Sequence, residues 1–348
     1  MFSLGKKEGL VRTSLALILA VGVVAVASGC SSISTPVACA PTVKAGSASA
    51  QITATGDIAK APTVEFPSPL YTKSLEATTL VKGTGLVLAK NAPAQVQASI
   101  YSGKTGKLLG ATSMQPAGAL ALTAGSASPL AQAIECQTVG SRIASVVTAK
   151  EMYGDQIPTA DPVIAPTDAL VIITDIERGF LAKADGALTM LQPGFPSIVT
   201  APDGTPGVTF LAEDAPTTLK VETVRDGDGQ KIKDGDDVLV HYTQLPWPEK
   251  GTTTSSVLNT TWTDKSPVAW SMAPFVAAAP SADGTSAGTS TGVISGIKTA
   301  MVGKTVGSQI LIVIPPGSDG FPEASLPDGV TNTTTLVYVV DVLGINQQ

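Results

Sequence analysis

Four short stretches of this chain occur twice, in the same order. Two pairs have starting points 144 residues apart: Ala61–Phe66 (APTVEF) with Thr205–Phe210 (TPGVTF), and Thr79–Gly85 (TLVKGTG) with Thr223–Gly229 (TVRDGDG). In a third pair, the stretches begin at Val139 and Val306, which are 167 residues apart. In the fourth they begin at Asp168 and Thr334, which are 166 residues apart. Similarity at a nearly constant spacing indicates a duplicated structural unit. The alternative is a chance similarity between Val- and Thr-rich strands.

The repeated stretches are short, rich in Val, Ile and Thr, and bounded by Gly and Asp, as is typical of β-strands. The spacing grows from 144 to 166 residues, so the second copy is longer by about 22. We place the extra length in Ser281–Gly292 and in the loop Gln244–Thr254. The sequence therefore predicts a first copy at residues 50–192 and a second at 193–348.

The composition agrees with two β-rich domains and excludes several functions. A chain of 348 residues is long enough for two domains, and with 43% hydrophobic residues it is too apolar for wholesale disorder. The net charge is −6 without a basic stripe, so we expect no nucleic-acid partner. His241 is the only histidine, which argues against a histidine-rich metal site or a Ser-His or Cys-His catalytic centre. We expect neither a metal nor a cofactor.

The N-terminal segment has the pattern of an export signal. Lys6, Lys7 and Arg12 precede an apolar run, and small residues lead up to Cys30. This end resembles a bacterial lipobox, although Ala27 stands where a larger aliphatic residue is usual. The resemblance implies a signal peptide over residues 1–29, a lipid on the Cys30 thiol and a location on the outer face of the cell membrane. The alternative is an uncleaved membrane anchor, which also places the chain outside.

Residues 30–49 read as a flexible tether of Ser, Ala, Pro, Thr and Gly. Cys39 lies in this tether and Cys136 lies in the first copy. Outside the cytoplasm disulfides are stable, so the sequence allows a Cys39–Cys136 bond that would hold the tether against the first domain. Two unpaired cysteines are the alternative.

The second copy contains the most informative stretch, from Asp234 to Asn346. It predicts a strand in DGDDVLVHYT, a short helix over Ile294–Met301, a turn at Gly303, a strand over Ile310–Ile314 and a last strand in TTTLVYVVDVLGI. The Pro315-Pro316-Gly317 run ends the middle strand, because proline cannot donate to a β-ladder. The pattern predicts an α+β fold in which an antiparallel sheet surrounds one short helix.

The order of these motifs resembles the FKBP-type peptidyl-prolyl isomerases. The family's words GD-x-V-x-V-H-Y, V-I-x-G, V-G-x-x, I-P-P and T-L-V-F/Y-x-V all have counterparts here, over roughly 110 to 120 residues. The resemblance implies two FKBP-like domains and peptidyl-prolyl isomerase activity in the second. The partners would be proline-containing exported polypeptides. Such an enzyme needs a dry apolar pocket that binds the twisted amide, and neither a nucleophile nor a metal.

The resemblance also implies the site residues. The expected catalytic set is Tyr242, Asn259, Val293, Ile294, Ile297, Phe321 and Tyr338. The expected substrate-binding set is Leu258, Val268 and Trp270. Four of these depart from the family pattern: Asn259 replaces an aspartate, Leu258 an aromatic residue and Ile297 a tryptophan, while Val268 stands where another aromatic residue is common. Weaker activity than that of a typical member is expected.

The first copy is expected to be a degenerate FKBP-like domain. Ile100 is placed opposite Tyr242, Ile172 opposite Tyr338, and Leu130–Ile134 where the second copy has Val293–Ile297. His241 alternates with Tyr242 along its strand and is interpreted as structural. Asp226–Gly229 is interpreted as a turn, because it lacks the spacing of a calcium loop.

Three functions stay open at this point. The first is an isomerase, the second a catalytically inactive FKBP-like chaperone or protein-interaction lipoprotein, and the third a structural surface lipoprotein.

Overall fold

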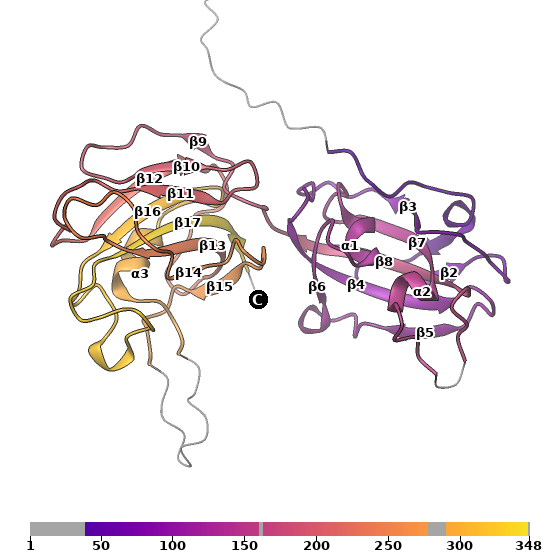
Figure 1. Cartoon of the computed structure of the whole chain (residues 1–348). Helices are drawn as coiled ribbons and strands as arrows, with labels where there is room; N and C mark the ends of the chain where they lie inside the picture. Colours follow the sequence, from indigo (N-terminus) through magenta and orange to yellow (C-terminus); the bar gives the residue numbers. More distant parts are fainter. Residues whose placement is uncertain (1–38, 160–162, 278–289, 347–348) are drawn as a thin grey trace, which may run out of the picture. The chain divides into compact units, whose positions relative to one another are not determined.

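The computed structural model describes residues 39–159, 163–277 and 290–346 (Figure 1). The predicted signal segment 1–29 and the predicted lipidation site Cys30 lie outside the described residues. The described part is mostly antiparallel β-sheet with a few short helices, which confirms the coarse prediction of an α+β chain rich in strands. No helix within it is long and apolar enough to span a membrane.

The first sheet is built from residues 76–179. Its strands, in spatial order, are β3 (Glu76–Val81), β7 (Arg142–Thr148), β8 (Ala169–Gly179), β4 (Pro93–Ser102) and β5 (Leu108–Ala111), with β6 (Leu120–Thr123) also paired to β4. Helix α1 (Pro129–Ile134) packs on one face, and the hairpin β1 (Thr53–Thr55) and β2 (Thr63–Glu65) lies over apolar residues of the other. The short helices η1 (Ser49–Gln51), η2 (Pro116–Gly118) and α2 (Ala149–Tyr153) complete this part.

The second sheet is built from residues 187–345. Its strands, in spatial order, are β14 (Asn259–Thr260), β13 (Asp237–Pro246), β17 (Leu336–Ile345), β16 (Gln309–Ile314), β12 (Lys220–Asp226) and β9 (Ala187–Leu188), with β15 (Val268–Ser271) also paired to β13. Helix α3 (Ser295–Met301) covers one face and the hairpin β10 (Ser197–Thr200) and β11 (Pro206–Thr209) the other, while η3 (Glu323–Ser325) lies in a loop. Because both faces are covered, β16 is buried throughout, and the apolar run ILIVI follows its first residue, Gln309.

The two sheets share the same irregularities at the spacing seen in the sequence. Two β-bulges of the first sheet lie between Thr79 and Val81 and between Gln95 and Val96, and two of the second lie between Thr223 and Arg225 and between Leu239 and Val240. Each bulge in the second sheet comes 144 residues after its counterpart. A bulge shifts the register at one position, so its recurrence makes the matched strands structurally equivalent.

This equivalence corrects one predicted match and confirms another. Ala98 pairs with Thr174 as Tyr242 pairs with Val340, so the counterpart of Tyr242 is Ala98 and not Ile100. Ile100 instead corresponds to Gln244, whose cross-strand partner is Tyr338. Ile172, the cross-strand partner of Ile100, therefore lies at the position of Tyr338, as predicted.

The helix of the first copy was matched four residues too early. After each helix, a backbone N–H donates to the loop before β4 or β13: Cys136 donates to Leu88 and Gly303 donates to Ile232. Both donors have positive φ, 63° at Cys136 and 90° at Gly303. Counting back from these positions, Leu130–Ile134 corresponds to Ile297–Met301. The helices are anchored at their C-terminal ends, which the local similarity of the sequences did not reveal.

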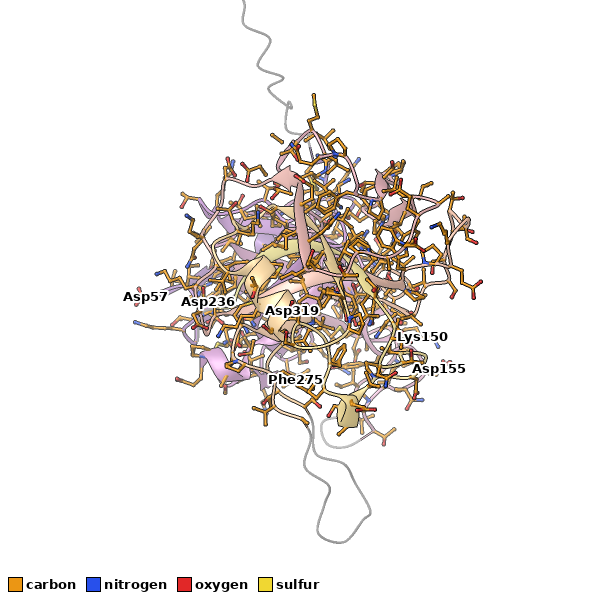
Figure 2. All side chains as sticks on the ribbon, turned by 90° about the vertical axis from the view of Figure 1, so that its left-hand side faces the viewer. Asp57, Lys150, Asp155, Asp236, Phe275 and Asp319 are labelled. Carbon is orange, nitrogen blue, oxygen red and sulfur yellow. A yellow bond between two sulfur atoms is a disulfide. The ribbon has the colours of Figure 1, made fainter. Side chains whose placement is uncertain are left out.

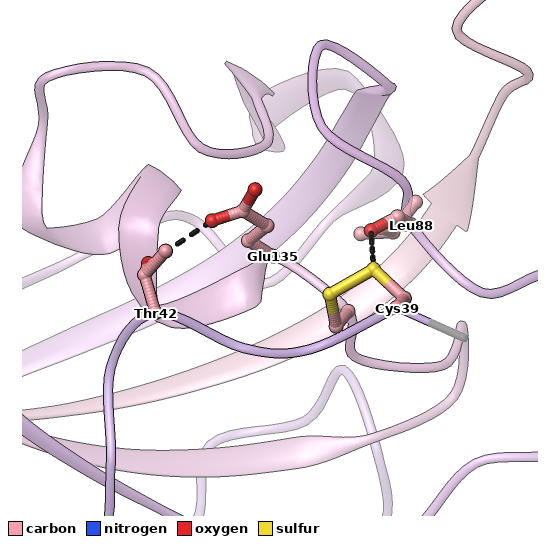
Figure 3. The surroundings of a disulfide bond; sticks show 5 residues. Cys39, Thr42, Leu88 and Glu135 are labelled. Atoms are coloured by element: carbon pink, nitrogen blue, oxygen red, sulfur yellow. Dashed lines mark hydrogen bonds between the residues drawn. A yellow bond between two sulfur atoms is a disulfide. The ribbon is translucent and has the colours of Figure 1, made fainter. Parts of the chain in front are cut away.

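A disulfide joins Cys39 to Cys136 across 97 residues (Figure 3). The Thr42 hydroxyl also donates to the Glu135 carboxylate at 3.0 Å. The described end of the predicted tether is therefore part of the fold. Ala48 and Ser49 are fully buried and donate backbone N–H groups to the Glu76 carboxylate. The prediction of a flexible segment through residue 49 is wrong for residues 39–49, because small side chains let this stretch pack against β3.

The segment that precedes Pro193 belongs with the second sheet. The Leu181 N–H donates to the Leu343 carbonyl at 3.0 Å, and β9 pairs with β12. The predicted division at residue 193 thus separates residues that bond to the same sheet. A short strand such as β9 has too few residues to show a period in the sequence.

Candidate functional site

Three aromatic side chains form a wall on the face of the second sheet that carries α3. The ring centroids of Tyr242 and Trp270 are 4.9 Å apart, those of Tyr242 and Tyr338 6.1 Å, and those of Trp270 and Tyr338 6.3 Å. All three pack against the apolar core beneath α3. We call Tyr242, Trp270 and Tyr338 the aromatic wall. The structure thus brings together three residues that the sequence placed in the site.

The strands determine which side chains share this face. Gln244 and Tyr338 are cross-strand partners on β13 and β17, and Tyr242 lies two residues before Gln244. Cross-strand partners and residues two apart point to the same side of a sheet. The phenol of Tyr338 is almost fully buried, and burial raises the pKa of both tyrosines above the ordinary value. Both hydroxyls therefore stay protonated at neutral pH.

Val293 and Ile294 precede the first turn of α3 and are both buried. The Val293 N–H donates to the Ala273 carbonyl at 3.2 Å, and the Ile294 carbonyl accepts from Lys298. The Ile294 N–H has no acceptor within the described part of the chain. An unpaired backbone donor is a ready partner for a ligand carbonyl, because leaving it unbonded costs free energy. Ile297 lies in the first turn of α3 and is also buried.

Leu258, Val268 and Phe321 also pack against this core. Val268 is the cross-strand partner of Val240, and the Leu258 N–H donates to the Gln244 carbonyl at 2.9 Å. Phe321 packs edge-to-face on Phe275, with centroids 5.7 Å apart. It is the Phe275 ring that Phe321 contacts, and no ring contact with the aromatic wall is found among the described residues.

Asn259 is the predicted residue that the structure does not bring into contact with the others. It is exposed on the two-residue edge strand β14, and its side chain makes no hydrogen bond with any residue the structure describes. It is the cross-strand partner of Gln244, so it lies at the rim of the same face. A short edge strand holds its side chains loosely, and Asn259 lacks the charge that would attract a donor.

Sequence reasoning missed three residues at this site. Phe275 packs on Phe321, Val330 packs on the core, and Gln244 is the buried cross-strand partner of Tyr338. The Gln244 Nε2 atom is buried and has no hydrogen-bond partner in the described structure. Strand alternation with Tyr242 could have identified Gln244. Phe275 and Val330 lie in loops and gave no periodic signal.

His241 lies on the opposite face, as expected of a structural residue. Its Nδ1 atom is 2.7 Å from the Thr261 hydroxyl, and its ring stacks on Trp262 at 4.2 Å. Burial lowers its pKa to about 4, so the ring is neutral at pH 7. On the same face, burial raises the pKa of Asp341 to about 6. Among the described residues, no group of three or more His, Cys, Asp or Glu could hold a metal ion.

No protein-family model and no curated protein matches the chain. Among solved structures, the chain is similar to the three FKBP domains of wheat FKBP73, with 14% identity, a TM-score of 0.31, and coverage of 79% of this chain and 96% of that one. FkpA from Escherichia coli has 22% identity and a TM-score of 0.27, with coverage of 42% and 51%. A peptidyl-prolyl cis-trans isomerase from Pseudomonas syringae has 20% identity and a TM-score of 0.26, with coverage of 31% and 77%.

Proposed function

We propose that the second sheet and α3 form a peptidyl-prolyl cis-trans isomerase of FKBP type. One observation carries the proposal: the aromatic wall of Tyr242, Trp270 and Tyr338 packs on the same apolar core as Ile294, whose N–H is unpaired within the described structure. An apolar wall and a free backbone donor on one core suit an extended peptide that carries a proline ring. The same arrangement has no use for a nucleophile, a metal or a cofactor.

The chemistry follows from the amide bond. Rotation about an X-Pro bond has a barrier of about 18–20 kcal/mol, because the twisted amide loses its resonance. The twisted form carries less charge on its carbonyl oxygen, so an environment without water favours it over the planar forms. The proline ring would rest against the aromatic wall while Ile294 donates to a peptide carbonyl. The neutral tyrosine hydroxyls add no charge that would favour the planar amide.

The first copy would not share this activity. Ala98 and Ile172 stand at the positions of Tyr242 and Tyr338, so the first copy has no aromatic side chain at either of these two positions. We interpret residues 50–179 as a degenerate FKBP-like copy kept for folding or for contacts with other proteins. The substrates would be exported proteins that contain proline, and a lipid on Cys30 would hold the chain on the outer face of the cell membrane. Mass spectrometry of the N-terminal peptide tests the lipid.

The test of the proposed activity is exchange NMR on proline peptides mixed with the full chain. We expect catalysed cis-trans exchange, and a fall in kcat/KM of at least about tenfold for Tyr242→Ala, since a large apolar side chain contributes about 1.5–3 kcal/mol. Tyr71→Ala is the matched control, because Tyr71 is 73% exposed and lies in the first copy. Equal loss in both variants, or no exchange with a folded wild-type chain, would contradict the proposal.

A second candidate is an FKBP-like chaperone that binds proline peptides without turning them over. The exposed, unbonded Asn259 favours it, because the family has an aspartate at that position. Calorimetric binding of the same peptides, in the absence of any catalysed exchange, would support this function over the enzyme.

A further inference from the structure

A small cavity lies in the connection between β16 and β17, over residues 315–335. It has a volume of about 220 Å³. Most of its lining side chains are apolar, and they come from the two strand ends and from both halves of the connection: Ile314, Pro315, Phe321, Leu326, Val330 and Leu336. Sites for whole small molecules measure about 300–1,000 Å³, so a cavity of this size suits one long side chain. We call it the loop cavity.

The first wall of the loop cavity is attached to α3. The Gly296 N–H, in the helix, donates to the Asp319 carbonyl at 2.9 Å, and Figure 2 shows Asp319 beside α3. The Ser325 N–H donates to the Pro322 carbonyl at 2.8 Å and closes η3, whose first residue is Glu323. These backbone bonds fix the first wall without any ligand.

The second wall is a turn closed by its own threonines. The Thr331 N–H donates to the Thr334 hydroxyl at 2.9 Å, and the Thr334 N–H donates to the Thr331 carbonyl at 3.1 Å. Across the opening, the Asn332 amide donates to Glu323 Oε1 at 3.4 Å. Asn332 and Glu323 both line the cavity and are both exposed, so they mark its mouth. Because both walls are held in place, less entropy is lost when a side chain binds between them.

The mouth of the loop cavity carries an unmatched negative charge. Glu323 is the one charged residue among those described around the cavity. Asp319 and Asp328 lie in the same connection, and the sequence contains no Lys, Arg or His over residues 305–348. None of these three carboxylates forms an ion pair within the described part of the chain.

An apolar cavity with a carboxylate at its mouth matches a side chain that has an apolar stem and a cationic end. Lys and Arg bury their stems and keep the charge at the surface. The Glu323 Oε2 atom has no bond within the described structure, and a guanidinium can donate two parallel N–H groups to a carboxylate, which favours Arg. The nearby helix does not supply this charge, because Lys298 is paired with Asp234 at 2.6 Å. An acidic side chain would be repelled, and an apolar one would leave the carboxylate unmatched.

We propose that the loop cavity is a docking site for an arginine side chain on a partner polypeptide. The stem lies on the apolar floor and the guanidinium binds Glu323, while lysine binds more weakly. The inference goes beyond the proposed isomerase, because Tyr242, Trp270 and Tyr338 lie outside the lining of the cavity and the occupant needs no proline. The cavity gives the second copy a preference for basic segments of other proteins.

The test is an NMR titration of the full chain, with labelled methyl groups, against short Gly-Ser peptides without proline. The peptides differ only at a central Arg, Lys, norleucine or Glu. The Arg peptide should shift the methyl signals of Leu326 and Val330 and bind about tenfold more tightly than the norleucine peptide, the scale of a hydrogen bond to a charged group. The Lys peptide should lie between them, and the Glu peptide should not bind.

Glu323→Gln is the variant that isolates the charge. It keeps the length of the side chain and an acceptor for Asn332. The affinity for the Arg peptide should fall about tenfold, to that of the norleucine peptide, and the affinity for norleucine should stay unchanged. Glu249→Gln is the matched control, because Glu249 is exposed in the same copy, lies outside the cavity and changes the net charge equally. High salt should weaken the Arg and Lys peptides and not the norleucine peptide, because it screens exposed charges.

Several outcomes would overturn the proposal. Norleucine binding as tight as Arg would assign the cavity to an apolar side chain, and no shift with any peptide would leave it without an occupant. An equal loss of Arg affinity in Glu323→Gln and Glu249→Gln, or shifts that spare Leu326 and Val330, would show attraction to the acidic chain as a whole. Self-association that the peptides do not displace would assign the cavity to a second copy. Failure of the proposed isomerase leaves this test intact, since none of the peptides contains proline.

Discussion

Arg142 and Asp175 form a buried, two-point ion pair across β7 and β8, with Nε–Oδ1 and Nη2–Oδ2 distances of 2.7 and 2.6 Å. The guanidinium also donates to the carbonyls of Gly56 and Asp57, so the ion pair fixes the loop of the leading hairpin to the sheet. In the second sheet the equivalent partners are Gln309 and Asp341, joined by one 2.7 Å hydrogen bond. At the same strand positions, the aspartate is therefore bonded to a charged arginine in the first copy and to an uncharged glutamine in the second.

Replacing Arg142 by Met should destabilise the first copy strongly. It leaves Asp175 buried without its counter-ion, and breaking a buried pair in this way costs about 3–5 kcal/mol. Urea unfolding of the full chain measures the loss. Lys60→Ala is the control, because the Lys60–Asp57 pair is exposed and should contribute nothing measurable. Equal midpoints for both variants would show that Asp175 finds another partner.

Asp341 should make the second copy less stable as the pH rises. Burial raises its pKa from 3.8 to about 6 in the folded state, so the stabilising contribution is complete below pH 3.8 and is lost as the pH passes 6. Asp341→Asn cannot ionise, so its stability relative to the wild type should improve from pH 4 to pH 7 by on the order of 2–3 kcal/mol. A stability difference independent of pH would mean that Asp341 titrates normally.

His241 should make the second copy less stable as the pH falls. Burial lowers its pKa from 6.5 to about 4, so the folded state disfavours the proton and stability is lost as the pH falls from 6.5 towards 4. His241→Phe keeps an aromatic ring against Trp262 and removes the titration. Denaturant midpoints across this window should fall for the wild type more than for the variant. Parallel curves would contradict the lowered pKa.

Gln244→Met should stabilise the protein while it removes a polar group from the site. The buried Nε2 of Gln244 has no partner among the described residues, and such a donor costs about 1–3 kcal/mol. Thermal unfolding should therefore occur at a higher temperature. Gln97→Met is the matched control, because the buried Gln97 donates to the Gln115 carbonyl at 2.8 Å and should lose stability. A loss of stability in Gln244→Met would show that its amide is bonded in solution.

Cys39→Ser should destabilise the first copy by removing a constraint on the unfolded chain. For a loop near 100 residues the expected loss is about 4–5 kcal/mol. Cys136→Gly breaks the same bond but should lose less, since Cys136 has a φ of 63° and glycine tolerates the left-handed region. Denaturant unfolding with and without reductant measures the stability loss of both variants. An equal effect of reductant on wild type and Cys39→Ser would show that the bond does not contribute.

Much of the second copy could be predicted from its sequence. The helix predicted at Ile294–Met301 is found at Ser295–Met301, and the strand predicted at Ile310–Ile314 is found at Gln309–Ile314. These elements were predictable because apolar runs bounded by Gly and Pro leave little choice of conformation. Tyr242 and Tyr338 were expected in the site because of the resemblance to the FKBP-type isomerases, and the register of β13 and β17 puts both on one face.

What could not be predicted depends on contacts between distant segments. The matching bulges before Val96 and Val240 identify Ala98, and not Ile100, as the counterpart of Tyr242. Phe275 meets Phe321 only because a ladder and a helix bring two loops together. The exposed position of Asn259 is set by a two-residue edge strand, which is too short to show a strand pattern in the sequence.

The disulfide also determines how the fold would carry a mechanical load. A pull on the N-terminal end of the chain enters the described structure at Cys39 and passes through the sulfur atoms to Cys136, just after α1. The covalent shortcut takes tension away from the 97-residue path between them, which includes the leading hairpin and β3 to β6. Under tension those strands would stay paired while the force continues along the chain into β7.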